Sequence, residues 1–277
     1  MRLVVLTGDG PEHRYVTGRL ADAFPDELRA IVLSEPAPQS LSARLRGYRR
    51  RYTISQISSR ILARLYSRWT GKARRRDETV TRVLFPRGDD KRMPRPDLVR
   101  VVPGHNSAES LSLLRSLEPD VIAVYGTAMI RPPVIALARN AILNMHTGLS
   151  PFYRGSDTIF WALHDERLDR IGVTVHLLDP GIDSGAIISA TRLSIDPSDN
   201  EDSLFAKAVA VGAERYVEAI RMAASGNLRA LPQSLEVGRE YRFVDRTVAA
   251  ERRVDRLVAG GICRRFADSS LAASDPS

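Results

Sequence analysis

The chain has 277 residues, of which 43% are hydrophobic and 27% charged, with 41 Lys and Arg against 33 Asp and Glu and a formal net charge of +8. These values are typical of a globular protein with a full core, built as one large domain or as a domain with an appendage. Residues 1–7 are too few for the apolar part of a signal peptide, and no run approaches the roughly 18 apolar residues of a membrane span. The single cysteine allows no internal disulfide, so we expect a cytoplasmic protein.

The basic charge is concentrated in one segment. Residues 44–76 contain 12 Lys and Arg and no Asp or Glu, which leaves 29 basic and 33 acidic residues in the rest of the chain. The positive charge therefore belongs to one element and not to the main body.

The first elements in chain order predict a parallel α/β sheet. An apolar strand at residues 2–7 is followed by a glycine loop, a helical pattern at 12–24 and a second strand at 28–33. The loop contains Gly8 and Gly10 but lacks the third glycine of a dinucleotide-binding fingerprint. It is either a tight turn or a helix N-terminus that could hold a substrate anion.

The basic segment interrupts this pattern. Apolar residues keep helical spacing over residues 41–52 and again over 54–69, and the two sets are out of phase around Thr53, which could cap the second helix. This predicts a basic helical hairpin inserted at about residues 40–96. Residues 77–96, which are charged and contain Gly88 and three prolines, are expected to be a linker that returns to the sheet.

The sheet pattern then resumes. Strands are expected at residues 98–102, 120–125, 141–145, 173–178 and 186–195, with helices at 107–117, from Pro132, and at 201–223. A short apolar run at 241–244 and a basic helix at 248–257 follow, and residues 267–277 are expected to be disordered. We therefore predict a catalytic domain at 1–225, carrying the insertion, and a short C-terminal extension at 226–277.

Three polar residues lie where predicted strands end. Asn144 and His146 close one strand, and Asp183 follows the next in a turn with two glycines. A carboxamide can donate a hydrogen bond to an oxyanion, an imidazole can do the same or move a proton, and a carboxylate can assist the imidazole or accept a proton through water. No serine or cysteine nucleophile accompanies them, and the three-ligand set of a catalytic zinc is missing, so no metal is expected.

These residues carry a family resemblance. The stretch N-M-H-T-G-L-S-P-F-Y-R-G at residues 144–155 and G-V-T-V-H-L-L-D-P-G-I-D-S-G at 172–185 resemble the 10-formyltetrahydrofolate-dependent formyltransferases. That family includes methionyl-tRNA formyltransferase, glycinamide ribonucleotide transformylase and sugar N-formyltransferases. The resemblance covers roughly residues 120–231. It implies a Rossmann-like formyltransferase fold, with a mostly parallel central sheet flanked by helices.

The resemblance also implies roles for particular residues. Asn144 and His146 would polarise the formyl carbonyl and hold its oxyanion, and Asp183 would orient a water and help remove the amine proton. The donor, 10-formyltetrahydrofolate, would bind along two loops. Its candidate contacts are Gly126, Met129, Ile130, Leu178 and Gly181.

The acceptor side departs from the family pattern. The family usually has Ser-Leu-Leu-Pro after the histidine, whereas this chain has Gly148-Leu149-Ser150-Pro151, which suggests an unusual acceptor. Two interpretations stay open for each of the other candidates. His13 could contact an acceptor phosphate, or it could lie at the solvated end of a helix. Residues 153–154 could line the acceptor side or only pack. The substrate-binding candidates are Gly10, His13, Gly148, Ser150, Tyr153 and Arg154.

We therefore expect formyl transfer to the primary amine of a small molecule, such as a nucleotide-linked amino sugar. Only about fifty residues follow the last predicted sheet-flanking helix, which argues against tRNA as acceptor. Methionyl-tRNA formylation, hydrolysis of the donor, and a non-catalytic binding module that uses the basic hairpin are the alternatives. Residues 44–76 could be solvated, contact an anionic membrane or bind nucleic acid, of which nucleic acid is the least expected, and a homodimer is compatible with the sequence.

Overall fold

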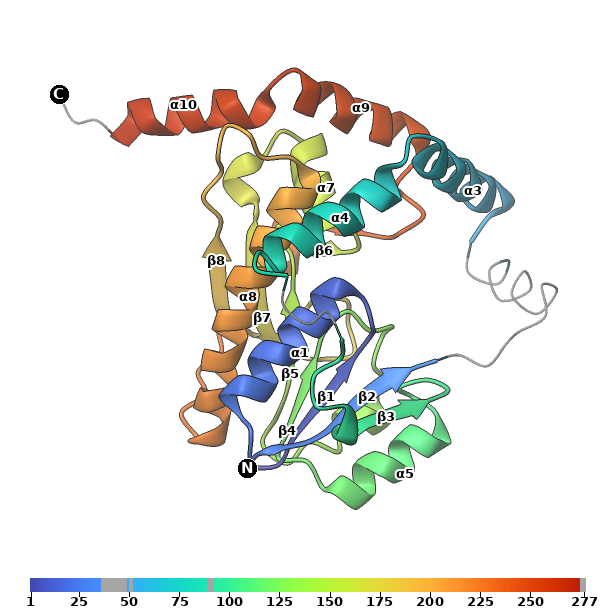
Figure 1. The fold of residues 1–277 in the computed structure, drawn as a ribbon, viewed down its shortest axis with the longest axis vertical. Coiled ribbons are helices and arrows are strands. Elements are labelled where there is room, and N and C mark those ends of the chain that lie inside the picture. Colours follow the sequence, from blue (N-terminus) through green and yellow to red (C-terminus); the bar gives the residue numbers. More distant parts are fainter. Residues whose placement is uncertain (36–48, 50–51, 89–91, 275–277) are drawn as a thin grey trace.

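A seven-stranded sheet forms the centre of the protein, with strand order β3-β2-β1-β4-β5-β7-β8 (Figure 1). The computed structural model describes residues 1–35, 49, 52–88 and 92–274. Neighbouring strands from β3 to β5 run parallel, whereas β7 and β8 are antiparallel to their neighbours. The strands are β1 (Leu3–Thr7), β2 (Leu28–Ser34), β3 (Val99–Val102), β4 (Val121–Val124), β5 (Ala141–His146), β7 (Gly172–Leu177) and β8 (Ile187–Arg192). The predicted α/β fold with a mostly parallel sheet is confirmed.

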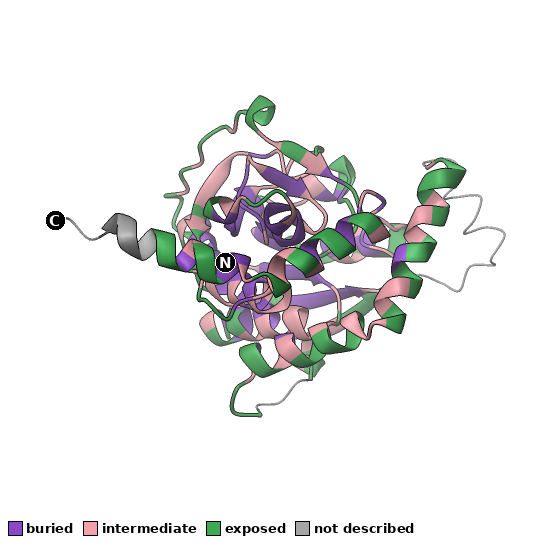
Figure 2. Cartoon of the chain, turned by 90° about the horizontal axis from the view of Figure 1, so that it is seen from above, coloured by how far each residue is buried: buried purple, intermediate pink, exposed green. Residues whose placement is uncertain are grey.

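Helices cover both faces of the sheet, because successive strand residues point to opposite sides. In β1, Leu3 and Val5 pack with α1 (Pro11–Ala23) and α8 (Glu201–Ala224). Val4 and Leu6 pack with α5 (Ala108–Leu117) and α6 (Pro132–Ile135). Figure 2 shows the buried residues gathered in the sheet and on the helix faces turned toward it. Two apolar layers therefore hold the ends of the strands in fixed positions.

The inserted segment differs from its prediction. Residues 77–96 were expected to be a linker, but α4 runs Lys72–Leu84 and packs against α1 and α8. Its Val80 and Leu84 are buried in the main core. They lie four residues apart and so share one face of the helix. The packing of this face on the main core stabilises a helix whose other residues are mostly charged. The helix expected over residues 41–52 lies almost entirely outside the described residues.

The helix before α4 begins as the sequence predicts. In α3 (Ile54–Trp69), the Thr53 side chain accepts a hydrogen bond from Gln56 N, and the Gln56 side chain accepts one from Thr53 N. This reciprocal capping satisfies two free amides of the first turn. One side of α3 carries apolar side chains that are at least half exposed: Ile54, Ile61, Leu62, Leu65 and Trp69. The hairpin in the described structure is therefore formed by α3 and α4.

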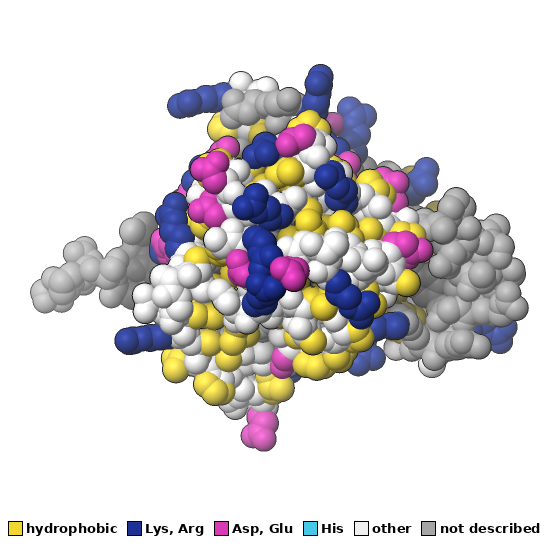
Figure 3. Space-filling model, turned by 90° about the horizontal axis from the view of Figure 1, so that it is seen from below, with side chains coloured by type: hydrophobic (Ala, Val, Ile, Leu, Met, Phe, Trp, Pro, Cys, Tyr) yellow, Lys and Arg dark blue, Asp and Glu magenta, His cyan; other side chains and the backbone are white. Residues whose placement is uncertain are grey.

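Charged side chains of both signs lie on the end of the molecule away from the hairpin (Figure 3). Figure 3 shows the end of the molecule opposite α3 and α9, where Lys and Arg side chains are interspersed with Asp and Glu and with hydrophobic patches. No helix in the described part of the chain combines the length and the apolar character needed to cross a bilayer.

The C-terminal residues build a second, smaller core. Strand β9 (Arg239–Tyr241) pairs in parallel with β6 (Tyr153–Gly155), and α9 (Val248–Ala259) packs on α7 (Thr158–His164). The last helix, α10, runs Ile262–Ser274, so residues 267–274 are helical rather than disordered as expected. Ile262 and Cys263 are buried in this second core and give α10 an apolar anchor.

Candidate active site

Four polar side chains meet at the ends of β5 and β7. Asn144 and His146 project from β5, and Asp183 lies in the loop between β7 and β8. Asn144 is paired across the antiparallel ladder with His176 of β7. Because cross-strand partners project to the same face of a sheet, His176 joins the three predicted residues.

The amide of Asn144 connects this cluster. Its Nδ2 lies 3.1 Å from His176 Nε2 and 3.2 Å from Asp183 Oδ1. The Nδ1 of His176 lies 2.7 Å from the carbonyl oxygen of Leu177 and donates to it. The other ring nitrogen, Nε2, lies between the Asn144 amide and Asp183 Oδ1, which is 3.4 Å away, so the three side chains meet at one point.

His146 lies between two acceptors. Its Nε2 is 3.1 Å from the carbonyl oxygen of Tyr153, and its Nδ1 is 3.3 Å from Asp183 Oδ2. A neutral imidazole donates to one of these acceptors at a time, according to its tautomer. The same Asp183 oxygen accepts a hydrogen bond of 2.8 Å from the backbone N–H of Gly155.

This environment keeps Asp183 ionised although its side chain is only 15% exposed. Burial works against the charged form. The electrostatic interaction with His146, the contact with His176 and the hydrogen bond from Gly155 N outweigh it and hold the pKa of Asp183 well below its usual range. A buried carboxylate beside two histidines is thus available to accept or relay a proton.

A cavity of about 520 Å³ opens beside the cluster, and all four polar side chains line it. All five predicted donor-binding residues also line it: Gly126, Met129, Ile130, Leu178 and Gly181. Its size and mixed polar and apolar walls are typical of small-molecule sites. The walls further include Glu12, Thr147, Ser156, Phe205 and Phe243, which the sequence did not indicate as site residues.

One wall depends on close packing between a loop and a histidine. Gly126 has φ +61°, and a Cβ placed there would lie 2.2 Å from His13 Cε1, so only glycine fits. His13 Nδ1 lies 2.9 Å from Thr7 Oγ1, and burial lowers the pKa of His13. The structure therefore places His13 on the cavity wall as a largely buried side chain.

The remaining predicted acceptor residues do not line the cavity in the described structure: Gly10, Gly148, Ser150, Tyr153 and Arg154. Gly10 is the N-cap of α1. The backbone N–H of Ser150 donates to Thr174 Oγ1, and the Tyr153 hydroxyl lies 3.3 Å from Asp165 Oδ2. Arg154 is buried, with Nη2 3.5 Å from the carbonyl oxygen of Leu235. The structure therefore does not bring these five residues to the cavity.

Gly148, where the chain departs from the family pattern, is a point of close approach to His146. A Cβ there would lie 2.4 Å from His146 Nε2 and 2.6 Å from Thr158 Oγ1. We expect Gly148→Ala to displace the imidazole from Asp183 and to reduce turnover by about 100-fold, as misplacement of a catalytic group by about 1 Å can. Turnover should be compared with Gly18→Ala, where nothing lies within 4 Å of the added methyl. Equal rates would show that the loop adjusts without moving His146.

Comparison with known proteins identifies the family of this protein. The family model described as "Formyl transferase" matches residues 69–220, which is more than half of the chain. The protein belongs to the formyltransferase family.

Individual relatives agree. The chain is 30% identical over 170 residues to a methionyl-tRNA formyltransferase of Thermodesulfovibrio yellowstonii, covering 57% of this chain and 54% of that protein. It therefore spans about half the length of the curated relatives it matches. A sugar N-formyltransferase from Shewanella superposes with a TM-score of 0.57 at 13% identity, covering 93% and 88% of the two chains. An N-formyltransferase from Helicobacter canadensis, solved with folinic acid and dTDP-3-aminofucose, gives 0.53 at 14% identity, covering 87% and 71%. The two solved structures confirm the fold.

Proposed function

We propose that this protein transfers a formyl group from 10-formyltetrahydrofolate to the primary amine of a small-molecule acceptor. The observation that carries the proposal is the convergence of Asn144, His146 and Asp183 on one cavity. That cavity is also lined by the loops at residues 125–130 and 178–183. Loops of this kind, with Met129 and Ile130 on one side and Leu178 on the other, offer apolar walls for a planar pterin ring.

The cluster suits each step of the transfer. The acceptor amine attacks the formyl carbon, and the carbonyl oxygen becomes an oxyanion. Asn144 and His146 donate hydrogen bonds to this oxyanion. When the donor is bound, each of the two residues turns an N–H bond to the oxyanion from a contact within the protein: Asn144 from His176, and His146 from Asp183 or the carbonyl oxygen of Tyr153. Asp183 accepts the proton of the attacking amine, directly or through a water. The bond from the formyl carbon to N10 of the folate then breaks, and N10 takes up the proton as tetrahydrofolate leaves.

A nucleotide-linked amino sugar is the acceptor class we favour. The Helicobacter canadensis enzyme, which shares the fold, was solved with dTDP-3-aminofucose. Tetrahydrofolate release from 10-formyltetrahydrofolate, measured with a panel of amino-sugar nucleotides, amino acids and charged tRNA, tests the proposal. We expect release that depends on one class of amine.

The same assay separates the other activities. Release without any amine would favour hydrolysis of the donor, and release only with charged tRNA would favour the methionyl-tRNA activity of the curated relatives. If no tetrahydrofolate is released in any reaction and folinic acid does not bind, the proposed transfer is contradicted. The remaining interpretation is then a non-catalytic binding module.

A further inference from the structure

A second cavity, of about 570 Å³, lies between the inserted hairpin and the main body. The α3 wall presents Arg60, Ala63, Arg64 and Ser67, which share one helix face by their spacing. The α4 wall presents Lys72, Arg75, Arg76 and Thr79, and the opposite side is formed by the start of α8 and by α9. The exposed apolar side chains of α3 do not line it, so the two faces of this helix differ in character.

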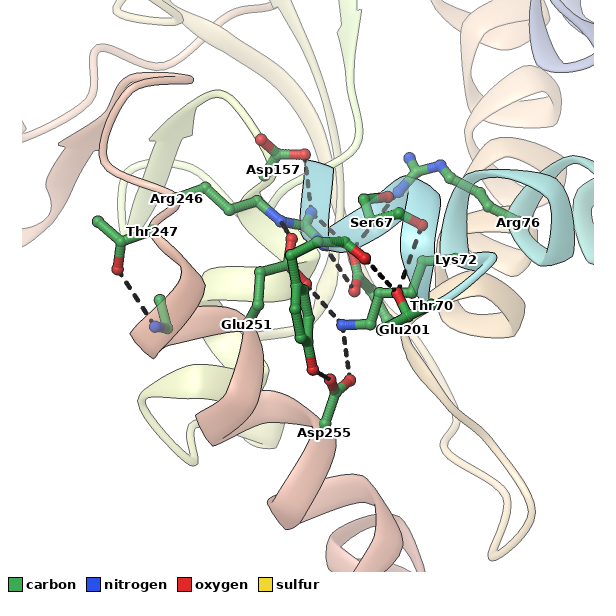
Figure 4. Close-up of polar contacts among 12 residues, drawn as sticks. Ser67, Thr70, Lys72, Arg76, Asp157, Glu201, Arg246, Thr247, Glu251 and Asp255 are labelled. Atoms are coloured by element: carbon green, nitrogen blue, oxygen red, sulfur yellow. Dashed lines mark hydrogen bonds and ion pairs between the residues drawn. The ribbon is translucent and has the colours of Figure 1, made fainter. Parts of the chain in front are cut away.

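Ion pairs fix the rear wall of this cavity. The Arg246 guanidinium contacts three carboxylates, with Nη1 3.0 Å from Asp157 and 2.8 Å from Glu201, and Nε 2.7 Å from Glu251 (Figure 4). Lys72 lies between Glu251 and Asp255 at 2.5 and 2.6 Å (Figure 4). Because Lys72 begins α4 and its partners lie on α9, these contacts anchor the hairpin and preform the cavity.

The lining charges do not balance once these pairs are formed. Six lining residues are basic and five acidic, and ion pairs within 4 Å occupy three of the bases, Lys72, Arg76 and Arg246, and four of the acids. Among the described lining residues, the three arginines Arg60, Arg64 and Arg75 make no ion pair within 4 Å. Asp202 is the one lining acid that makes none. The unpaired charge on the hairpin side is therefore positive.

Arg60 is the most constrained of these three arginines. Its Nε is buried and has no hydrogen-bond partner in the described structure, and burial lowers its pKa. Its guanidinium carbon lies 5.6 Å from the ring centre of Phe243. A buried guanidinium nitrogen without an acceptor is costly, and an anionic ligand would supply the acceptor.

The second cavity adjoins the candidate active site. A small cavity of about 60 Å³ shares Arg76, Asp157 and Glu201 with it, and shares Thr147 and Phe205 with the active-site cavity. Phe243 lines the active-site cavity, while Arg60, which faces the Phe243 ring, lines the second. One extended acceptor could therefore contact both.

We propose that this second cavity binds the phosphate group of the acceptor while the acceptor amine lies beside Asn144 and Asp183. Arg60 and Arg64 of α3 and Arg75 of α4 pair with the phosphate. A guanidinium matches phosphate geometry with two parallel hydrogen bonds, which favours phosphate over a neutral ligand. The inference rests on the proposed formyl transfer and extends it, since it defines the acceptor as a phosphate-bearing amine and gives the insertion a role in binding.

Inorganic pyrophosphate serves as the probe for this site. In isothermal titration calorimetry of the full chain at fixed ionic strength, we expect Arg60→Gln/Arg64→Gln to weaken pyrophosphate binding by at least tenfold. The matched control is Arg68→Gln/Arg74→Gln, which removes the same charge from the same hairpin outside the cavity and should change affinity less than twofold. Far-ultraviolet circular dichroism and an unchanged affinity for folinic acid will show that both variants are folded.

Three results would overturn the proposal. The first is that the unmodified protein does not bind pyrophosphate, and the second is that both double variants lose the same amount of pyrophosphate affinity. The third is competition between pyrophosphate and folinic acid, which would place the anion in the active-site cavity. Failure of the proposed function gives a different result. Folinic acid would not bind, or no amine would be formylated, while pyrophosphate binding kept its dependence on Arg60 and Arg64.

Discussion

We expect Asp183→Asn to slow formyl transfer by about 10²- to 10⁴-fold, the usual contribution of a general acid or base. Asparagine keeps the size of the side chain but carries no negative charge. It therefore loses the electrostatic interaction with His146, 3.3 Å away, and it cannot accept at both positions from Asn144 and the backbone of Gly155. The measurement is the rate of tetrahydrofolate release with the best acceptor amine at saturating donor.

Asp169→Asn provides the matched control, because Asp169 is about half exposed and pairs with Arg167 away from the cavity. It should keep the normal rate. Turnover by Asp183→Asn equal to that of this control would sink the assigned mechanism.

The same substitution should change the acid stability of the protein. The folded-state pKa of Asp183 is depressed, so its contribution to the free energy of unfolding is present above the unfolded pKa of about 3.9 and is lost as the pH falls through the folded value. Denaturation of the Asp183→Asn protein should accordingly depend less on pH below about 4 than that of the unmodified protein.

The largest expected effect on stability comes from Arg246→Met, which should lower the free energy of unfolding by about 3–5 kcal/mol. Arg246 is 9% exposed, and its three partners belong to the start of α7, the start of α8 and α9. These carboxylates hold the pKa of Arg246 above its usual value despite burial. Methionine fills part of the volume but leaves Asp157, Glu201 and Glu251 close together without their shared cation.

Urea denaturation provides the measurement, with Arg242→Met as control. Arg242 is exposed and pairs with Glu240, whose side chain is 30% exposed, so its replacement should change stability by no more than about 0.5 kcal/mol. A similar midpoint for both variants would mean that water or Lys72 takes over the role of Arg246.

Much of the fold could be predicted from local pattern, and the departure at α4 has a physical cause. Buried strands such as β1 and β4 are short apolar runs between turn residues, and Thr53 gives a local capping signal. Helix α4 was missed because Val80 and Leu84 are its only buried residues, and the partners that bury them, α1 and α8, are distant in sequence. The prediction of a linker relied on the charged composition of this segment, which reflects the exposed face of α4 and not the apolar face that packs on the core.

In the candidate site, too, some residues could be predicted from local sequence and others could not. Asn144, His146 and Asp183 could be identified because each stands at a strand end or in a glycine turn. His176 alternates with apolar residues within a strand, and its place in the cluster depends on the register of β7 against β5. A predicted antiparallel pairing of these two strands would have been the signal. The contribution of Phe243 comes from a distant segment, for which the sequence gives no local indication.

Because α4 supplies part of the main core, the inserted segment is not a module that can be exchanged. Its removal would leave α1 and α8 with uncovered apolar surface where Val80 and Leu84 now pack. The contact between α4 and α8 also joins segments more than a hundred residues apart, so it closes a long loop and raises the contact order of the domain. Substitutions within the hairpin that spare Val80 and Leu84 should therefore be tolerated better than exchange of the hairpin as a unit.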